Sequence, residues 1–176
     1  MIGLDKFTED YFLKYSTKPV KIKPYDPQQT ILGGFYISKI SGYLKGIDAE
    51  VKLRGSSLFK IAGKGEVEVG VYLDEANWDL AIKEISKYFG KPENIESNYV
   101  KFNDVYEGKE NEIILLKGHE AEVDKKLHSY LVGHPKLLKE YAEVKKKYCF
   151  SKREYNIRKN DFLSSVISEI PEDYKY

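Results

Sequence analysis

Two glutamates separated by a single valine stand at the start of a run that is typical of a β-strand. Glu66 and Glu68 open the segment EVEVGVYL at residues 66–73, in which valine recurs at alternate positions. Side chains two positions apart on a strand point to the same face, so the carboxylates should converge while the valines face a core. Two carboxylates on one side can hold Mg²⁺, which neutralises triphosphate charge in nucleotidyl transfer. We therefore predict that Glu66 and Glu68 are metal ligands and catalytic residues.

A glycine–serine turn lies upstream of this pair. Ser56 stands ten residues before Glu66, directly after a predicted strand, and a loop that carries two lysines follows it. Backbone N–H groups at such a turn can bind phosphate, and lysine ammonium groups can offset phosphate charge. Nucleotidyltransferases of the polymerase-β type share a Gly-Ser followed, after a loop, by two carboxylates on a strand, and this segment resembles that pattern. The predicted nucleotide-binding residues are Gly55, Ser56, Ser57, Lys60 and Lys64.

A third carboxylate is expected on a later strand of such a site. Glu112 begins the run EIILLK at residues 112–117, and we predict that it helps to deprotonate the acceptor. Asp104, on the preceding predicted strand, is the reserve candidate. The alternative for these glutamates is a half-exposed strand whose acidic side chains simply face water.

The helices and strands that must position these residues can be predicted from the sequence pattern, which indicates a single α/β domain with a small mixed sheet. Apolar residues recur at helical or strand spacing along most of the chain, and no linker is long enough to divide it. Residues 1–18 are predicted to form a helical appendage, and residues 19–176 the domain. The predicted strands are 18–24, 49–55, 66–73, 98–106 and 112–117; the predicted helices are 5–16, 26–46, 74–90 and three between residues 123 and 170.

Composition limits the class of partner. The chain has 29 Lys and Arg against 28 Asp and Glu, so its formal net charge of +1 gives no global attraction to nucleic acid or to a membrane. No uncharged apolar stretch approaches the roughly 20 residues that span a bilayer. The one cysteine cannot form an internal disulfide, and nothing at the amino terminus reads as a signal peptide. We expect a cytoplasmic protein.

Three separated segments resemble the GrpB-like family, in the family's order. They are PVKIKPYDP at 19–27, LRGSSLFKIAGKGEVEV at 53–69 and LHSYLVGHPKLLKEYAEVKKKY at 127–148. The resemblance implies a nucleotidyltransferase-like fold with a mixed sheet, flanking helices and a C-terminal helical portion. It also implies a link to coenzyme A synthesis at the level of a partner, because related domains occur fused to dephospho-coenzyme A kinase. This chain has no GxxxxGK[ST] phosphate-binding loop of its own.

Two functional hypotheses follow from these observations. The first is Mg²⁺-dependent transfer of a nucleotidyl group from a nucleoside triphosphate to an unknown acceptor, either RNA or protein. The second is a catalytically degenerate module that binds a nucleotide, RNA or protein. The second hypothesis is favoured by departures from the family pattern, in which aspartate usually stands where Glu68 falls and Arg-Asp-Tyr-Leu-Arg stands near residues 127–132.

Overall fold

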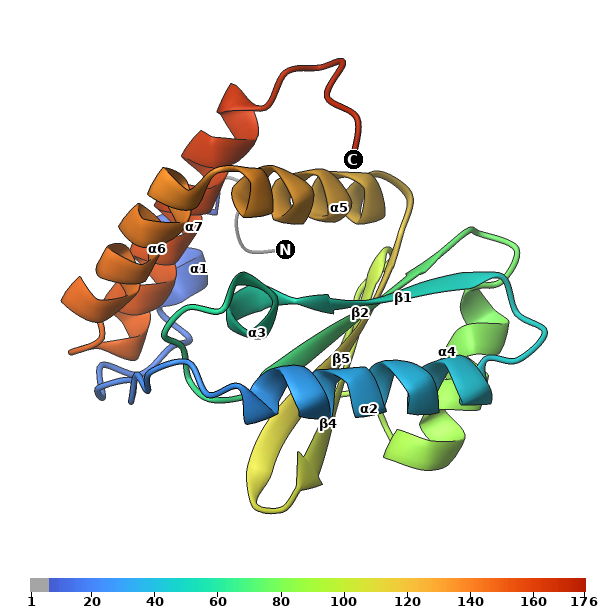
Figure 1. Ribbon diagram of the computed structural model, residues 1–176. Helices are drawn as coiled ribbons and strands as arrows, with labels where there is room; N and C mark the ends of the chain where they lie inside the picture. The colour runs from blue at the N-terminus through green and yellow to red at the C-terminus, as the bar shows by residue number, and fades with distance from the viewer. Residues whose placement is uncertain (1–6) are drawn as a thin grey trace. The chain divides into compact units, whose positions relative to one another are not determined.

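A computed structural model describes residues 7–176, which group into two compact units (Figure 1). The sheet unit contains Tyr25–Lys60 and Gly65–Glu122. The helical unit contains residues 7–24, Ile61–Lys64 and Val123–Tyr176. The boundary proposed after residue 18 stays a prediction. In the described part of the chain, no helix is long and apolar enough to cross a membrane.

The sheet unit is built on five strands, and the predicted mixed sheet is confirmed. The strands are β1 (Ala49–Arg54), β2 (Val67–Leu73), β3 (Asn94–Ile95), β4 (Tyr99–Tyr106) and β5 (Lys109–Lys117), in the order β1-β2-β5-β4-β3. Only β2 and β5 pair in parallel; the other neighbours are antiparallel. The turn between β4 and β5 is shorter than predicted, because Glu107 and Gly108 both adopt positive φ, at 51° and 71°, and close a two-residue hairpin.

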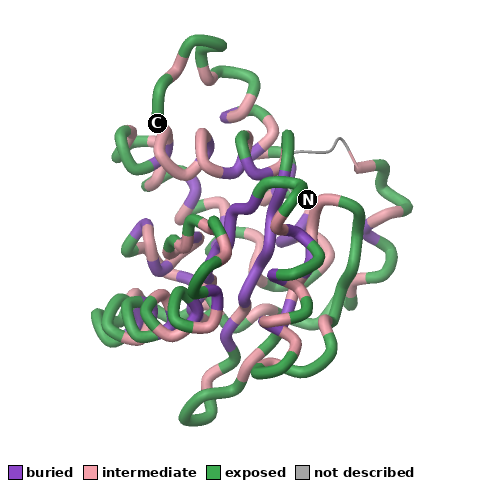
Figure 2. The backbone as a smooth tube through the Cα atoms, turned by 90° about the vertical axis from the view of Figure 1, so that its right-hand side faces the viewer, coloured by how far each residue is buried: buried purple, intermediate pink, exposed green. Residues whose placement is uncertain are grey.

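One face of the sheet carries the core. Val67, Val69 and Val71 are at most 1% exposed, as their alternation predicted. They pack in one cluster with side chains of α2 (Gln28–Tyr43) and α4 (Trp78–Phe89), so both helices cover the same face. Figure 2 shows buried residues running along the strands.

The two core helices begin and end where the sequence predicted within a few residues. An Asp26 carboxylate oxygen accepts the Gln28 N–H at 2.9 Å at the start of α2, and Asp74 accepts the Asn77 N–H at 2.9 Å before α4. Gly90 ends α4 with φ of 75°. Side-chain acceptors at helix starts and glycine after helix ends satisfy backbone groups that the helix leaves unpaired.

A short helix replaces the first part of the loop that was predicted after residue 55. This helix, α3 (Gly55–Phe59), is a single turn that follows β1 directly. It ends at Lys60, which adopts a left-handed φ of 55° and donates its backbone N–H to the Ser56 carbonyl. A five-residue helix lies below the length at which sequence periodicity is informative.

The helical unit contains α1 (Glu9–Phe12), most of α5 (Gly118–Gly133), α6 (Pro135–Lys147) and α7 (Lys152–Glu169). The predicted helix over 5–16 was too long, although residues 5 and 6 lie outside the described part. The predicted strand over 18–24 was wrong: Val20 donates to the Cys149 carbonyl at 2.7 Å, and only one bridge forms, between Lys23 and Gly63. Pro19 and Pro24 have no N–H for a strand ladder, which explains the difference.

Candidate functional site

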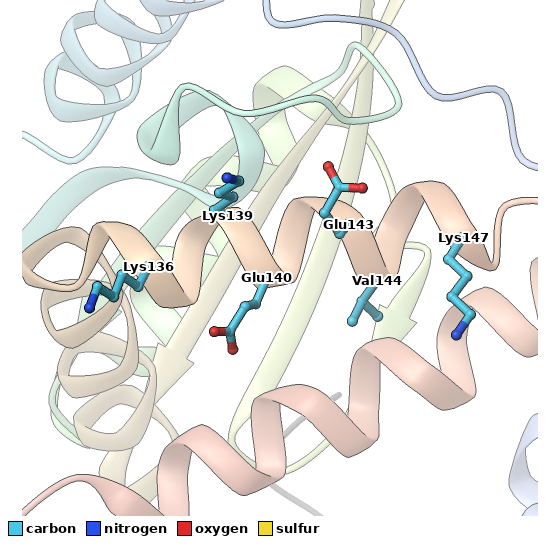
Figure 3. Close-up of a pocket in the computed structure, with 6 residues that line it drawn as sticks. All are labelled: Lys136, Lys139, Glu140, Glu143, Val144 and Lys147. Carbon is cyan, nitrogen blue, oxygen red and sulfur yellow. The ribbon is translucent and has the colours of Figure 1, made fainter.

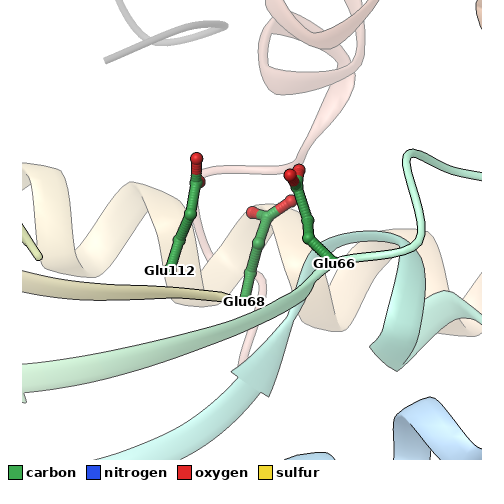
Figure 4. Close-up of side chains that lie close together, drawn as sticks. All are labelled: Glu66, Glu68 and Glu112. Carbon is green, nitrogen blue, oxygen red and sulfur yellow. The ribbon is translucent and has the colours of Figure 1, made fainter. Parts of the chain in front are cut away.

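Three carboxylates converge on the sheet face opposite the core. Glu66, Glu68 and Glu112 each offer one carboxylate oxygen, and these oxygens lie within 4.8 Å of one another. Figure 4 shows the three side chains pointing in the same direction. All three are half-buried. The sequence-predicted candidates are thus brought together in space.

Strand register explains this convergence. Glu68 on β2 pairs directly with Glu112 on the parallel strand β5, so the two side chains leave the sheet side by side. Glu66 precedes Glu68 by two positions and shares its face. The reserve candidate Asp104 pairs with Asn111, one position out of phase with Glu112, and accepts a 2.5 Å hydrogen bond from the Tyr36 hydroxyl. Asp104 therefore belongs to the opposite face.

Gly55 lies directly against the Glu68 carboxylate. A Cβ at this position would stand 2.7 Å from a Glu68 carboxylate oxygen, closer than real Cβ atoms approach any neighbour. The Gly55 φ of 62° is also a conformation that L side chains rarely adopt. The glycine is needed both for the turn into α3 and for the space that Glu68 occupies.

The serines after Gly55 differ in their surroundings. Ser57 is 1% exposed, and its hydroxyl donates to the Glu66 carbonyl at 3.0 Å. Gln29 donates to the same carbonyl at 3.3 Å, so two side chains hold the backbone that carries the first glutamate. Ser56 is half-buried in the first turn of α3. Within this pair, Ser57 supports the strand and Ser56 stands nearer the surface.

The two predicted lysines lie in different units. Lys60 is exposed at the end of α3, in the sheet unit that holds the carboxylates. Lys64 is also exposed, but it belongs to the segment Ile61–Lys64 of the helical unit. A shared role for Lys60 and Lys64 stays a prediction.

The carboxylates face cationic and phenolic groups that the sequence analysis did not identify. Lys101 on β4 places its ammonium 3.3 Å from a Glu112 carboxylate oxygen and also contacts Glu93. Burial lowers the pKa of Lys101, but Glu112 and Glu93 outweigh that effect and raise its pKa above the usual value. Burial raises the pKa of Tyr99 well above its usual value, and Glu112 and Glu68 add to the effect while Arg54 opposes it.

These neighbours could have been found only from the strand register. Arg54 is 6% exposed and pairs across β1 and β2 with Glu68. Lys101 and Tyr99 stand on the face of β4 that Asn103 shares, and Asn103 pairs with Glu112. Each residue is unremarkable in its own segment of sequence, because its charge acquires a partner only when distant strands pair.

The carboxylate geometry fits a divalent cation with oxygen ligands. An octahedral Mg²⁺ with bonds of about 2.1 Å has adjacent ligand oxygens about 3.0 Å apart and opposite ones about 4.2 Å apart. The oxygens of Glu66, Glu68 and Glu112 lie within 4.8 Å, so side-chain shifts of about 1 Å would bring them to these spacings. Glutamate side chains have three rotatable torsions with which to make such shifts.

A cavity of about 590 Å³ is present elsewhere, on α6 of the helical unit. Figure 3 shows its lining side chains leaving this helix, with Val144 directed toward α7. The lining residues are Lys136, Lys139, Glu140, Glu143, Val144 and Lys147. None of the predicted site residues is among them. This hollow is therefore distinct from the carboxylate site.

No protein-family model and no curated protein matches the chain. Solved structures do match. The structure of the GLD-2/RNP-8 complex is similar with a TM-score of 0.54 and 10% identity, over 88% of this chain and 60% of that one. The c-di-GMP synthase CdnE from Capnocytophaga granulosa matches with a TM-score of 0.45 and 16% identity, over 81% of this chain and 64% of that one. Polymerase beta from Leishmania infantum matches with a TM-score of 0.43 and 10% identity, over 82% and 54%.

The first of these similarities shows the fold. With a TM-score of 0.54, the GLD-2/RNP-8 structure shares the fold of this chain, and the predicted nucleotidyltransferase-like fold is confirmed. The chain spans less than two thirds of the length of each of the three.

Proposed function

We propose that the sheet unit catalyses metal-dependent transfer of a nucleotidyl group from a nucleoside triphosphate to an acceptor. The observation that carries the proposal is the convergence of Glu66, Glu68 and Glu112 within 4.8 Å on one face of a nucleotidyltransferase-like sheet. Three carboxylates at this spacing repel one another, and a divalent cation bound among them would offset that repulsion. A divalent cation and a triphosphate are the complementary pair for such a site.

The three glutamates have different roles in this proposal. Glu66 and Glu68 would hold Mg²⁺, which when bound supplies charge neutralisation for the triphosphate and orients its oxygens. Glu112 is proposed to accept the proton of the attacking group on the acceptor. Lys101, 3.3 Å from Glu112, offsets part of the negative charge that three carboxylates bring together.

The turn into α3 is proposed to bind the phosphates. Gly55 and Ser56 begin α3 directly after β1, and Gly55 lies against the Glu68 carboxylate. Ser57 contributes by holding the Glu66 carbonyl at 3.0 Å. Lys60 and Lys64 are proposed to offset phosphate charge.

Family membership and partners are part of the same proposal. The three ordered sequence matches support membership of the GrpB-like family within the nucleotidyltransferase superfamily. The acceptor is proposed to be RNA or protein, and the link to coenzyme A synthesis and the cytoplasmic location belong to this proposal too. The alternative is the degenerate binding module, which is favoured by glutamate at position 68 in place of aspartate.

Calorimetric titration with ATP, GTP, CTP and UTP, in Mg²⁺ and in EDTA, tests the proposal. We expect at least one nucleotide to bind in Mg²⁺ only, and the Glu66→Gln/Glu68→Gln variant to lose this binding. The double variant Glu50→Gln/Glu107→Gln is the matched control, because it removes two exposed carboxylates and changes the net charge equally.

The outcomes separate the two hypotheses. Binding that the control keeps and the Glu66→Gln/Glu68→Gln variant loses places the nucleotide at the carboxylates. Binding that persists in EDTA, or in the Glu66→Gln/Glu68→Gln variant, supports the degenerate module. Absence of binding for all four nucleotides overturns the enzymatic proposal.

A further inference from the structure

Helix α2 carries apolar side chains on two faces, of which only one is used by the core. The sequence places one wide apolar stripe along this helix. The structure buries Tyr36, Ile40 and Leu44, each at most 3% exposed, but leaves Ile31 65% and Phe35 46% exposed. The core therefore buries only part of the apolar stripe on α2, and the exposed part requires another explanation.

The exposed half continues onto two neighbouring elements of the sheet unit. The Phe35 ring lies 5.6 Å from the Tyr106 ring at the end of β4. Tyr43 stacks on Tyr88 of α4 with ring centroids 3.4 Å apart and an interplanar angle of 3°. Tyr88 is 53% and Tyr106 39% exposed. We call this set the Lys39 surface: Phe35, Lys39, Tyr43, Tyr88 and Tyr106.

Lys39 lies among these rings. Its ammonium stands 5.7 Å from the Phe35 ring centroid and 6.0 Å from the Tyr43 ring centroid. It also lies within 5.8 Å of the ring centroids of Tyr36 and Phe89, which pack with the core. In the part of the chain that the structure describes, no carboxylate forms an ion pair with Lys39. The surface thus offers flat aromatic faces around a cation whose charge no acidic side chain offsets.

We propose that the Lys39 surface binds single-stranded nucleic acid. Bases stack on exposed aromatic rings regardless of sequence, and lysines between the rings bind the phosphates, so one strand satisfies both features. Phe35 and Tyr43 are eight residues apart, about 12 Å along the helix, which is the length of three or four bases at about 3.4 Å each.

A second copy of the chain fits this surface poorly. Pairing of two copies about a two-fold axis places the same patch on both sides, so two Lys39 ammonium groups would meet at the centre of a desolvated interface. An anionic partner with planar rings has no such cost. The proposal does not depend on the carboxylate site or on a metal.

Fluorescence anisotropy with labelled oligo(U) and oligo(A) of about ten nucleotides, in EDTA, tests the proposal. We expect saturable binding that weakens as salt rises. Phe35→Ala and Tyr88→Ala should each weaken it about five-fold or more. Lys39→Gln should reduce the slope of log affinity against log salt by about 0.7. All three side chains lie at or near the surface, so the variants should fold.

Matched controls come from the helical unit. Phe150, 58% exposed, and the exposed Lys139 are changed to Ala and Gln, and we expect neither variant to alter binding. The Glu66→Gln/Glu68→Gln variant should bind the oligonucleotides as the native chain does, so failure of the nucleotidyl-transfer proposal leaves this result unaffected. Equal binding by native chain and surface variants overturns the proposal, as does no binding. Self-association that Phe35→Ala abolishes would instead identify an interface between copies.

Discussion

Gly55→Ala is the single change that best separates the role of the turn from the role of the carboxylates. The added methyl group has two effects at once. It places a side chain at φ of 62°, and it puts a Cβ 2.7 Å from the nearest oxygen of the Glu68 carboxylate. Gly118 provides the matched control, since its φ is 59° and a Cβ there would meet nothing within 4 Å. Both variants carry the same backbone strain, and only one of them displaces Glu68.

The expected magnitudes differ accordingly. The left-handed backbone costs an L residue about 1–2 kcal/mol, so Gly118→Ala should lower the free energy of unfolding by that amount. In Gly55→Ala the Glu68 side chain must also leave its rotamer, which adds about 0.5–1.5 kcal/mol. Misplacing one carboxylate of the cluster should weaken metal binding by about 10- to 100-fold, the range seen when groups that orient metal ligands are lost.

Urea denaturation measures the free energy of unfolding, and calorimetric titration with Mn²⁺ measures the metal affinity. We expect Gly118→Ala to lose stability but keep native metal affinity. Gly55→Ala should lose more stability and most of the metal affinity. If the two variants behave alike in both assays, the close approach of Gly55 to Glu68 has no consequence for the site and the argument fails.

Two further predictions concern charge and packing. Because Glu112 raises the pKa of Lys101 above the ordinary value of 10.5, their ion pair stabilises the fold fully below that pH, and its contribution is lost as the pH rises further. The urea midpoint should therefore fall more steeply above about pH 10.5 in the native chain than in Lys101→Met; equal slopes would contradict this. Gly34→Ala should stabilise α2 by about 0.5–1 kcal/mol, since a Cβ there meets nothing within 4 Å. Gly33→Ala should gain less or lose stability, because its Cβ would stand 2.6 Å from Leu53 Cδ1; a thermal melt of the two variants decides the order.

Local patterns in the sequence predicted the parts of the fold that local physics decides. The valine alternation of β2 predicted both its strand and its buried face, because alternate residues of a strand lie on the same face and the apolar set must face the core. The exposed part of the apolar stripe on α2 could not be predicted, since periodicity cannot tell a core-facing side chain such as Ile40 from an exposed one such as Phe35.

The candidate site was predictable to the extent that it lies within one segment. Glu66 directly precedes β2 and Glu68 lies on it, two positions apart in extended chain, so their convergence could be predicted from alternation. Lys101 and Tyr99 become neighbours of the site only through the pairing of β4 with β5. Glu112 was the leading sequence candidate for the third carboxylate and Asp104 the reserve, and each lies near an end of a predicted strand. Pairing of β4 with β5 put them on opposite faces.

The register that decides this difference is held by a buried amide. Asn111, 2% exposed, accepts the Val67 N–H at 3.3 Å and donates to the Lys109 carbonyl at 3.0 Å and to the Tyr36 hydroxyl at 3.3 Å. A slip of one residue between β2 and β5 would expose this side chain, break its hydrogen bonds to Val67 and Tyr36 and turn Glu112 into the apolar core. The amide side chain next to the third carboxylate is thus what keeps that carboxylate beside Glu68, and the site depends on it although Asn111 lies on the other face.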